Sequence, residues 1–467
     1  MQPEPRTLFD KLWEQHRVAR LNGEDLIAID RIFLHERTGA VALRSLAAAG
    51  RAVVDPARVF AVTDHIVDTR HGRTGTLVPG GDSFLSATRE ETRAAGIRLF
   101  DVGVPDPGIV HVISPELAIV LPGATLVCPD SHTCSQGALG ALAWGIGSTE
   151  AEHAMATGTL RLTRPRATRV TFEGALAPGV TAKDMALTLI ARHGAGGGEG
   201  DAIEFAGDAV RALDIEGRLT LCNMATEFAA MSGFIAPDEV TFDYLHGRRF
   251  APRGAEWDAA VAAWRELKTD PGARFDREIV IDAGAIVPMV SWGTSPQSAV
   301  GVDGRVPGQG ESGLGADGYA RAIDYMGLAP GQPLDALPID AAFIGSCTNS
   351  RIGDLRRAAA LVKGRRVAAG LQALVVPGSS AVRRAAEAEG LDRIFVDAGF
   401  EWRMSGCSLC FYAGGEGFAP GSRVISSTNR NFEGRQGPGI RTHIASPETV
   451  AASAIAGRIA DPRELSR

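Results

Sequence analysis

The second half of the chain alternates between short apolar runs and helical patterns. From about residue 285 onward, this alternation predicts strands at 341–344, 373–376 and 394–396, and helices at 354–363 and 382–389. Parallel strands need long crossover connections, and helices on both faces keep such a sheet buried. The pattern therefore predicts an α/β fold with a parallel sheet at this end of the chain.

The first part of the chain shows the same kinds of element with less regularity. Apolar spacing predicts a helix around 8–13, a buried strand at 124–128, a strand at 169–172, a helix at 182–192 and a polar helical segment at 248–274. We therefore expect mixed helices and strands here as well.

The chain is too long for one compact core. Its 467 residues suggest two to four domains. A new strand pattern begins after an Arg-Pro-Arg cluster near residue 165, and the regular alternation begins near residue 285. We therefore expect three domains, at residues 1–165, 166–284 and 285–467.

Composition limits the location and the partners. A hydrophobic fraction of 45% with 22% charged residues is typical of a globular protein. The net charge of -7 disfavours nucleic acid. The segment Met1–Arg6 carries acid and proline where a signal peptide needs a basic start, and no run approaches the ~20 apolar residues of a membrane span. We expect a cytoplasmic protein that binds neither nucleic acid nor a membrane.

Three of the six cysteines lie in small-residue loops near the end of the chain. Cys347 follows the predicted strand 341–344, and Cys407 and Cys410 share a tight loop. A Cys-x-x-Cys pair alone is ambiguous between zinc, a redox pair and no function. A structural zinc site needs four ligands, and no fourth cysteine is near in the sequence. Three thiolates suit an iron–sulfur cluster with one iron left open as a Lewis acid; a zinc-stabilised binding protein is the alternative.

The motifs around these cysteines resemble a known family. Gly345–Ser350, Gly406–Cys410 and Thr428–Arg435 are similar to the three C-terminal motifs of the aconitase superfamily. Segments at 127–133 and 221–227 also match in the expected order. The resemblance covers essentially the whole chain.

This resemblance implies a fold and a cofactor. It implies three α/β/α domains around a central 4Fe–4S cluster, without the swivelling domain of single-chain members. One cluster per chain would be held by Cys347, Cys407 and Cys410. A small partner subunit carrying the swivel domain would complete a heterodimer and supply the base that removes the carbon-bound proton.

The family's reaction is reversible loss of water from a hydroxy-di- or tricarboxylic acid. Segments 372–379 and 398–403 are most similar to the isopropylmalate dehydratase large subunits within the superfamily. The implied reaction interconverts 2- and 3-isopropylmalate, a step in leucine biosynthesis. Hydroxide is a poor leaving group, so the departing hydroxyl needs both a Lewis acid and a proton.

Catalytic residues follow from the same resemblance. In the Asp64–His65 pair, the carboxylate would orient the imidazole that protonates the leaving hydroxyl. His111 and His132 match histidines that the family partners with acids, here Asp130 and Glu227. A carboxylate beside an imidazole fixes its tautomer and stabilises its charged form.

Five further residues match the family's substrate site. They are Ser131, Asn349, Asn429, Arg430 and Arg435. A planar guanidinium suits a carboxylate because two donors meet two oxygens. The two asparagines would also support the cluster or its ligands.

The chain departs from the family pattern at three places: Ile66 replaces the usual Asn, and segments 67–71 and 411–415 differ. These changes leave the cysteines untouched but bear on the substrate, so homoaconitate, a dimethylmalate or a methylcitrate are alternatives. A cluster-containing RNA-binding regulator is an alternative of another class, disfavoured by the acidic charge.

Overall fold

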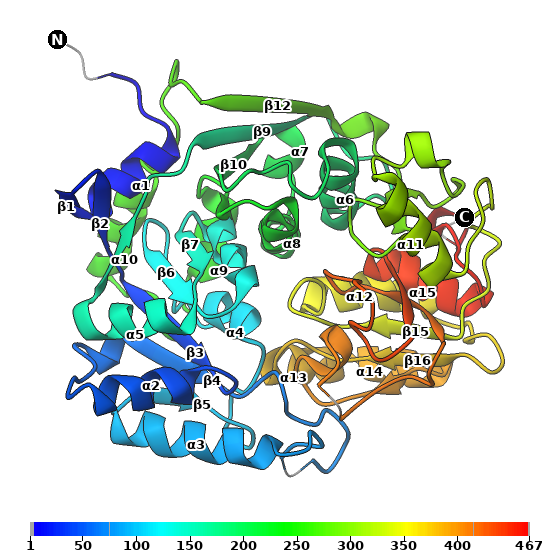
Figure 1. Cartoon of the computed structure of the whole chain (residues 1–467), viewed down its shortest axis with the longest axis horizontal. Coiled ribbons are helices and arrows are strands. Elements are labelled where there is room, and N and C mark those ends of the chain that lie inside the picture. Colours follow the sequence, from blue (N-terminus) through cyan, green and yellow to red (C-terminus); the bar gives the residue numbers. More distant parts are fainter. Residues whose placement is uncertain (1–3, 74, 414, 466–467) are drawn as a thin grey trace.

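The described part of the chain forms three parallel β-sheets flanked by helices (Figure 1). The computed structural model describes residues 4–73, 75–413 and 415–465. In Figure 1 the first sheet lies at the lower left, the second at the top and the third at the right. This architecture confirms the predicted α/β fold class. Within these residues, no helix is both long and apolar enough to cross a membrane.

The first sheet is parallel, with strand order β5-β4-β3-β6-β7. Its strands are β3 (Arg31–His35), β4 (Val59–Val62), β5 (Arg98–Phe100), β6 (Thr125–Cys128) and β7 (Leu142–Gly145). The accompanying helices are α2 (Gly39–Ala48), α3 (Gly81–Ala94), α4 (Val110–Glu116) and α5 (Ser148–Thr157). The strand predicted at 124–128 is β6, and all its residues are buried.

A small antiparallel sheet and the first helix join this part of the chain. The sheet contains β1 (Arg17–Leu21), β2 (Glu24–Ala28) and β8 (Thr159–Leu162). The helix predicted around 8–13 is α1 (Leu8–His16), and its predicted apolar face is buried. Thr7 and Asp10 cap its first turn reciprocally, which satisfies backbone N–H groups that the helix leaves free.

The second sheet is also parallel, with strand order β11-β10-β9-β12. Its strands are β9 (Ala167–Glu173), β10 (Ala202–Ala206), β11 (Ser232–Phe234) and β12 (Arg277–Asp282). The helices of this region are α6 (Ala182–His193), α7 (Asp208–Arg211), α8 (Ile215–Asn223), α9 (Glu239–Leu245) and α10 (Ala255–Trp264). The predicted strand at 169–172 and helix at 182–192 are confirmed as β9 and α6.

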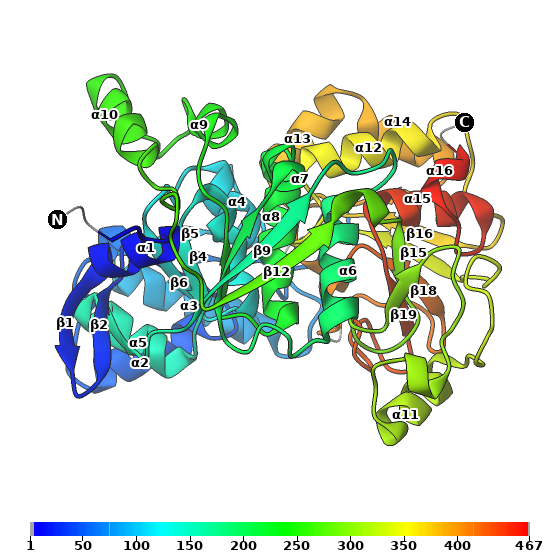
Figure 2. The same cartoon turned by 90° about the horizontal axis from the view of Figure 1, so that it is seen from above.

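The helical segment predicted at 248–274 is wrong in extent. Only α10 is helical there, because Pro252 and Gly254 precede it and Pro271 and Gly272 follow it. Figure 2 shows α10 standing away from the sheets. The prediction that this segment lies on the outside therefore holds for α10.

The third sheet follows a connecting region of β13 (Met289–Ser291), β14 (Ala299–Gly301) and α11 (Ala316–Met326). Its order is β17-β16-β15-β18-β19, all parallel. The strands are β15 (Ala341–Ile344), β16 (Gln372–Val375), β17 (Glu401–Trp402), β18 (Arg423–Ser426) and β19 (Arg441–Ile444). The helices are α12 (Ile352–Val362), α13 (Ser380–Ala388), α14 (Leu391–Ala398), α15 (Pro447–Ala456) and α16 (Pro462–Leu465).

The strand predicted at 394–396 is wrong, because these residues belong to helix α14. Leu391, Phe395 and Ala398 are buried at helical spacing, whereas Val396 is 55% exposed. Three consecutive apolar residues suggest a strand, but the buried residues on either side of them repeat at helical spacing. The other strands and helices predicted between 341 and 389 are confirmed.

One apolar core joins the first and second sheets. It includes Phe33 and Leu126 from the first sheet together with Val170, Phe172 and Phe205 from the second. The three parallel sheets draw their strands from separate stretches of sequence, and the domain boundaries at 165/166 and 284/285 stay predictions. The carboxyl ends of β3, β4 and β6 face those of β15 and β18, which places their loops around one space.

Candidate active site

Loops from the first and third sheets enclose a cavity of about 320 Å³. The three predicted cysteines, Cys347, Cys407 and Cys410, line it together with His65 and Asp130. Cys347 follows β15, Cys407 precedes the short 3-10 helix η6 (Ser408–Cys410), and Cys410 ends it. Ligands collect at such strand ends in α/β proteins. The structure thus brings the three predicted cysteines to one cavity.

Two serines beside the cysteines have unusual backbone angles: Ser346 precedes Cys347, and Ser408 lies between Cys407 and Cys410. Ser346 has φ 79° and Ser408 has φ 48°, values that non-glycine residues rarely adopt. The Ser346 hydroxyl lies 3.2 Å from the Cys410 sulfur and 4.0 Å from the Cys347 sulfur. The left-handed turns thus bring thiols from two loops to one hydroxyl group.

Amide and guanidinium groups donate to the sulfurs. Asn223 Nδ2 lies 3.2 Å from Cys347 Sγ, and Asn429 Nδ2 lies 3.4 Å from the same atom. Arg435 Nη2 donates to Cys410 Sγ over 3.7 Å. Such donors stabilise the thiolate form, which is the form that binds metals.

The cavity cysteines are free thiols, and Cys407 also groups with Asp64 and His65 closely enough to hold a metal ion. All six cysteines of the chain are buried and free of disulfides. Among the described residues, the three cavity sulfurs do not all lie within 4.8 Å of one another, a spacing that one tetrahedral ion with sulfur ligands would require. Burial raises the pKa of Cys347 to about 12, so this thiol ionises only beside a cation.

Asp130 gathers three histidines on one side of the cavity. Its carboxylate lies 3.1 Å from His65 Nε2, 3.0 Å from His111 Nε2 and 3.6 Å from His132 Nδ1. The His111 ring is close enough for an ion pair but is not aligned for a hydrogen bond. Burial disfavours the Asp130 carboxylate, but the charge of His111 and hydrogen bonds from the histidines hold its pKa well below its usual range.

His65 lies between two carboxylates. Its Nδ1 is 2.6 Å from Asp64 Oδ1, and its Nε2 faces Asp130. Burial disfavours the imidazolium, yet the charge of Asp64 and the hydrogen bonds to both acids raise the pKa of His65 well above its usual value. An imidazolium has two donors for two carboxylates, so this site favours the protonated ring.

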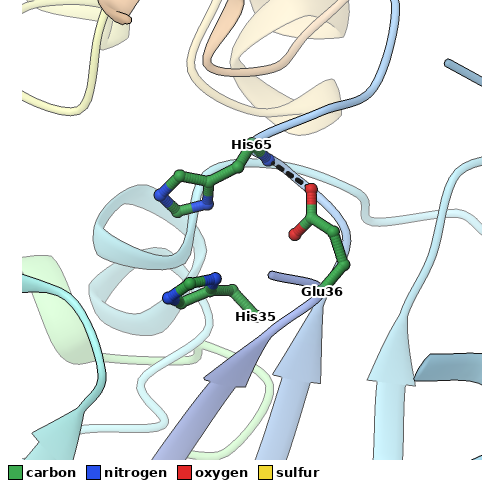
Figure 3. Close-up of side chains that lie close together, drawn as sticks. All are labelled: His35, Glu36 and His65. Carbon is green, nitrogen blue, oxygen red and sulfur yellow. Dashed lines mark hydrogen bonds between the residues drawn. The ribbon is translucent and has the colours of Figure 1, made fainter. Parts of the chain in front are cut away.

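Glu36 and His35 support His65 from below (Figure 3). Glu36 accepts backbone N–H groups from His65 and Ile66, each at 2.7 Å, and from Asp64 at 3.2 Å. The His35 ring stacks on the His65 ring with centroids 4.4 Å apart. The two rings and Glu36 are close enough together to hold a metal ion, but both carboxylate oxygens already accept backbone N–H groups.

The residues that depart from the family pattern flank His65. Ile66 is buried and packs with Val67 and Leu85 in a small apolar cluster. The Phe411 ring lies 5.7 Å from the His65 ring and lines the cavity. Both substitutions therefore change the immediate surroundings of the imidazole.

The predicted arginines occupy different environments. Arg430 Nε pairs with Glu227 Oε1 at 2.7 Å, and Glu227 also accepts from His132 Nε2 at 2.7 Å. Arg435 lies over the Phe411 ring, and its buried Nε has no hydrogen-bond partner among the described residues. Of the two predicted arginines, Arg435 is thus the one that no described carboxylate pairs with.

The other predicted substrate residues differ in whether they reach the cavity. Ser131 lines the cavity. Asn429 lies next to the sulfurs, because its Nδ2 donates a hydrogen bond to Cys347 Sγ. The structure does not bring Asn349 into the cavity, because its side chain is bound by Lys183, Thr220 and Asp354.

A larger cavity, of about 730 Å³, lies between α6, α8, α12 and α15. Its Arg357 pairs with Asp354, Glu448 and Asp214, so its charges are largely satisfied. Of the predicted site residues Asn349 lines it, but none of the predicted catalytic or cysteine residues does. The smaller cavity is the candidate site.

Sequence reasoning missed Glu36, His35, Asn223 and the fully buried Lys183. Lys183 Nζ donates to Asn349 Oδ1 at 3.2 Å and to two backbone carbonyls near Asn429. A His-Glu pair directly after a buried strand was the available signal for the first two, since ligands gather at such strand ends. A single lysine inside helix 182–192 gives no comparable signal.

Comparisons with known proteins show which family the chain is similar to. The model of the aconitase family (aconitate hydratase) matches residues 10–457. A relative from Bradyrhizobium diazoefficiens, 3-isopropylmalate dehydratase large subunit 1, is 53% identical over 468 residues, covering 99% of this chain and 97% of the relative. Among solved structures, the holo-form of aconitase X from Thermococcus kodakaraensis aligns with TM-score 0.47 at 13% identity, over 87% of this chain and 84% of that one.

The family match spans the motifs of both halves of the site. It includes the Asp64–His65 pair, the loop that carries Asp130, and all three cavity cysteines. The chain belongs to the aconitase family.

Proposed function

We propose that this chain is the large subunit of an isopropylmalate dehydratase, which interconverts 2- and 3-isopropylmalate by removing and adding water. The observation that carries the proposal is that one cavity presents three cysteine thiols and the His65 imidazole, held between two carboxylates. The relative that is 53% identical has this activity in its name.

The cofactor of this proposal is one 4Fe–4S cluster, with Cys347, Cys407 and Cys410 as ligands. When bound, such a cluster supplies a Lewis acid for the hydroxyl and carboxylate oxygens of the substrate. The buried thiols, the N–H donors to their sulfurs and the lack of a disulfide are the features that fit it. Asn223 and Asn429 would hold Cys347 in position.

His65 is the proposed general acid. Asp64 holds Nδ1, so the proton on Nε2 is the one that can pass to the leaving hydroxyl. The raised pKa keeps that proton in place at neutral pH. Asp130 orients the ring from the other side and shares its charge with His111 and His132. A positioned acid of this kind contributes about 10²- to 10⁴-fold to a rate.

Two arginines would act on the substrate carboxylates and the surrounding network. Arg435 has an unpaired donor and is proposed to bind a carboxylate. Arg430 is tied to Glu227, which places it in the network that holds His132. Ser131 lines the same cavity and would hydrogen-bond the substrate.

A small subunit carrying a swivel domain is the proposed partner. The relative's name contains the words large subunit. Aromatic side chains near the cavity are left open to solvent, with Tyr412 41% and Phe432 52% exposed. The partner would cover this side and supply the base for the carbon-bound proton. A cytoplasmic location is part of the same proposal.

The test is an assay of the anaerobically reconstituted two-subunit enzyme. The unsaturated acid is followed by its ultraviolet absorbance, which rises as 2-isopropylmalate, a dimethylmalate or a methylcitrate loses water and falls as homoaconitate gains it, with all four acids compared at equal concentration. The proposal predicts the highest kcat/KM for 2-isopropylmalate. Turnover of another acid without turnover of isopropylmalate would contradict the substrate and leave the family assignment intact.

A further inference from the structure

Arg37 is a cation of the cavity that neither the motifs nor the family resemblance assigns. It lies between the end of β3 and the start of α2, is exposed, and lines the cavity beside Phe411. Its guanidinium carbon lies 5.1 Å from the centroid of the Phe411 ring. Among the described residues, no carboxylate pairs with it. The side chain therefore presents an uncompensated positive charge to the cavity.

The three arginines of the cavity differ in what holds them. Arg430 is neutralised by Glu227. Arg435 has no carboxylate partner within the described ranges, and its guanidinium carbon lies 5.5 Å from the centroid of the Phe411 ring. Arg37 and Arg435 are thus two guanidinium groups that share one aromatic ring and lack acids.

The contact with the Phe411 ring restrains the Arg37 guanidinium but does not use its hydrogen-bond donors. A cation over an aromatic ring is held more weakly than one that donates a hydrogen bond to a charged group. A carboxylate is therefore the better partner when one enters the cavity. The guanidinium also offers two parallel donors to a carboxylate.

We propose that Arg37 binds one carboxylate of the substrate while Arg435 binds the other, with the Phe411 ring against the apolar substituent between them. This inference rests on the proposed function and deepens it, because it makes the site selective for acids with two carboxylates. Arg37 is then a specificity residue of the cavity.

The experiment compares two ligands on the reconstituted two-subunit enzyme. One is 2-isopropylmalate; the other is 2-hydroxy-2,3-dimethylbutanoate, in which methyl replaces the carboxymethyl arm. Calorimetry gives the dissociation constant of each ligand for the wild type, Arg37→Met and Arg37→Lys. Arg51→Met is the matched control, because Arg51 is exposed just after α2 and does not line the cavity.

The inference predicts that Arg37→Met weakens binding of the diacid by about tenfold to a hundredfold, the range expected for one charge-assisted contact. Binding of the monoacid should change by less than about twofold, and Arg37→Lys should restore part of the loss. The KM for isopropylmalate should rise more than kcat falls. Arg51→Met should resemble the wild type.

Three results would overturn it. Equal losses for both ligands would mean that Arg37 shapes the cavity without meeting the second carboxylate. No loss for either would mean that it does not touch the substrate. Separation of the two subunits in Arg37→Met, seen by size-exclusion chromatography, would make it a docking residue. If the wild type binds no isopropylmalate, the proposed function fails and the inference is left to a second comparison. Arg37→Met and Arg37→Lys are then compared with the wild type on whichever acid of the panel is turned over.

Discussion

Asp64 Oδ1 lies 2.6 Å from Nδ1 of its chain neighbour His65, and both side chains are withdrawn from solvent. Adjacent residues rarely contact through their side chains in a strand, because successive side chains point to opposite faces. Here the chain has left β4, and Glu36 holds the turn by its backbone N–H groups. The contact sets which protonation state of the imidazole the site favours.

Replacing Asp64 by Asn should move the pH dependence of the reaction. The raised pKa of His65 means that the protonated ring persists to high pH in the wild type. Asp64→Asn removes the charge that raises it, so the acid form is lost at lower pH. The alkaline limb of the kcat/KM profile should move to lower pH, and kcat at neutral pH should fall by about 10²-fold or more.

The matched control for this variant is Asp30→Asn. Asp30 also pairs with a histidine, His16 at 2.8 Å, but far from the cavity. This variant should lose stability and keep the wild-type pH profile. A profile for Asp64→Asn that coincides with the wild type would remove His65 from the role of acid.

Replacing Glu36 should unlock the turn that carries His65. Glu36→Ala leaves three buried N–H groups without an acceptor, and each such group costs about 1–3 kcal/mol. The free energy of unfolding should fall by about 3 kcal/mol or more in urea, and kcat should fall with it. Glu36→Gln keeps an acceptor oxygen and should lose less of both. Equal activity in the Ala variant would show that the turn holds its shape by other contacts.

Glu36 should also affect the pH dependence of stability. Burial, and then the charge of Asp64, raise the pKa of Glu36 to about 7. The native state therefore holds this proton more tightly than the unfolded chain, so stability falls as pH rises from about 5 to 7. Urea unfolding of Glu36→Gln across this range should show a shallower fall than the wild type. A steeper fall of stability in the variant than in the wild type would contradict the predicted direction of the pH dependence.

Replacing Lys183 should loosen the loops behind the cysteines. Its ammonium group donates to Asn349 Oδ1 and to the carbonyl oxygens of Ser427 and Thr428, at 2.8–3.2 Å. Lys183→Met keeps the apolar stem and leaves these acceptors without a donor, so stability should fall by about 2–4 kcal/mol. Iron should also be lost faster on dilution with a chelator. Lys363→Met, at an exposed lysine after α12, is the control and should match the wild type.

Much of the fold could be predicted from local sequence patterns. The buried strand β15 and the helices α6 and α12 have apolar runs or periodic faces bounded by glycine or polar residues. Helix α14 could not be read correctly from its three central apolar residues, because its buried face includes Leu391 and Ala398 on either side. Three-dimensional packing decides such short segments.

The candidate site was predictable only where residues form recognisable motifs. The cysteines and the Asp64–His65 pair lie in such motifs, and the structure brings them together. Glu36 and Lys183 act through backbone groups that are distant in sequence, and no local pattern records those contacts. The same applies to Arg37, whose role depends on a ring 374 positions further along the chain, at Phe411.

The most direct test of this account is the iron and sulfide content of the chain after anaerobic reconstitution. The account predicts about four iron atoms and as many sulfide ions per chain, with a brown chromophore, and loss of both in Cys347→Ala, Cys407→Ala and Cys410→Ala. Cys128→Ala, at a buried cysteine in β6 that does not itself line the cavity, should keep them. A colourless wild type that binds one zinc ion, or a cluster that survives all three cavity replacements, would contradict the account.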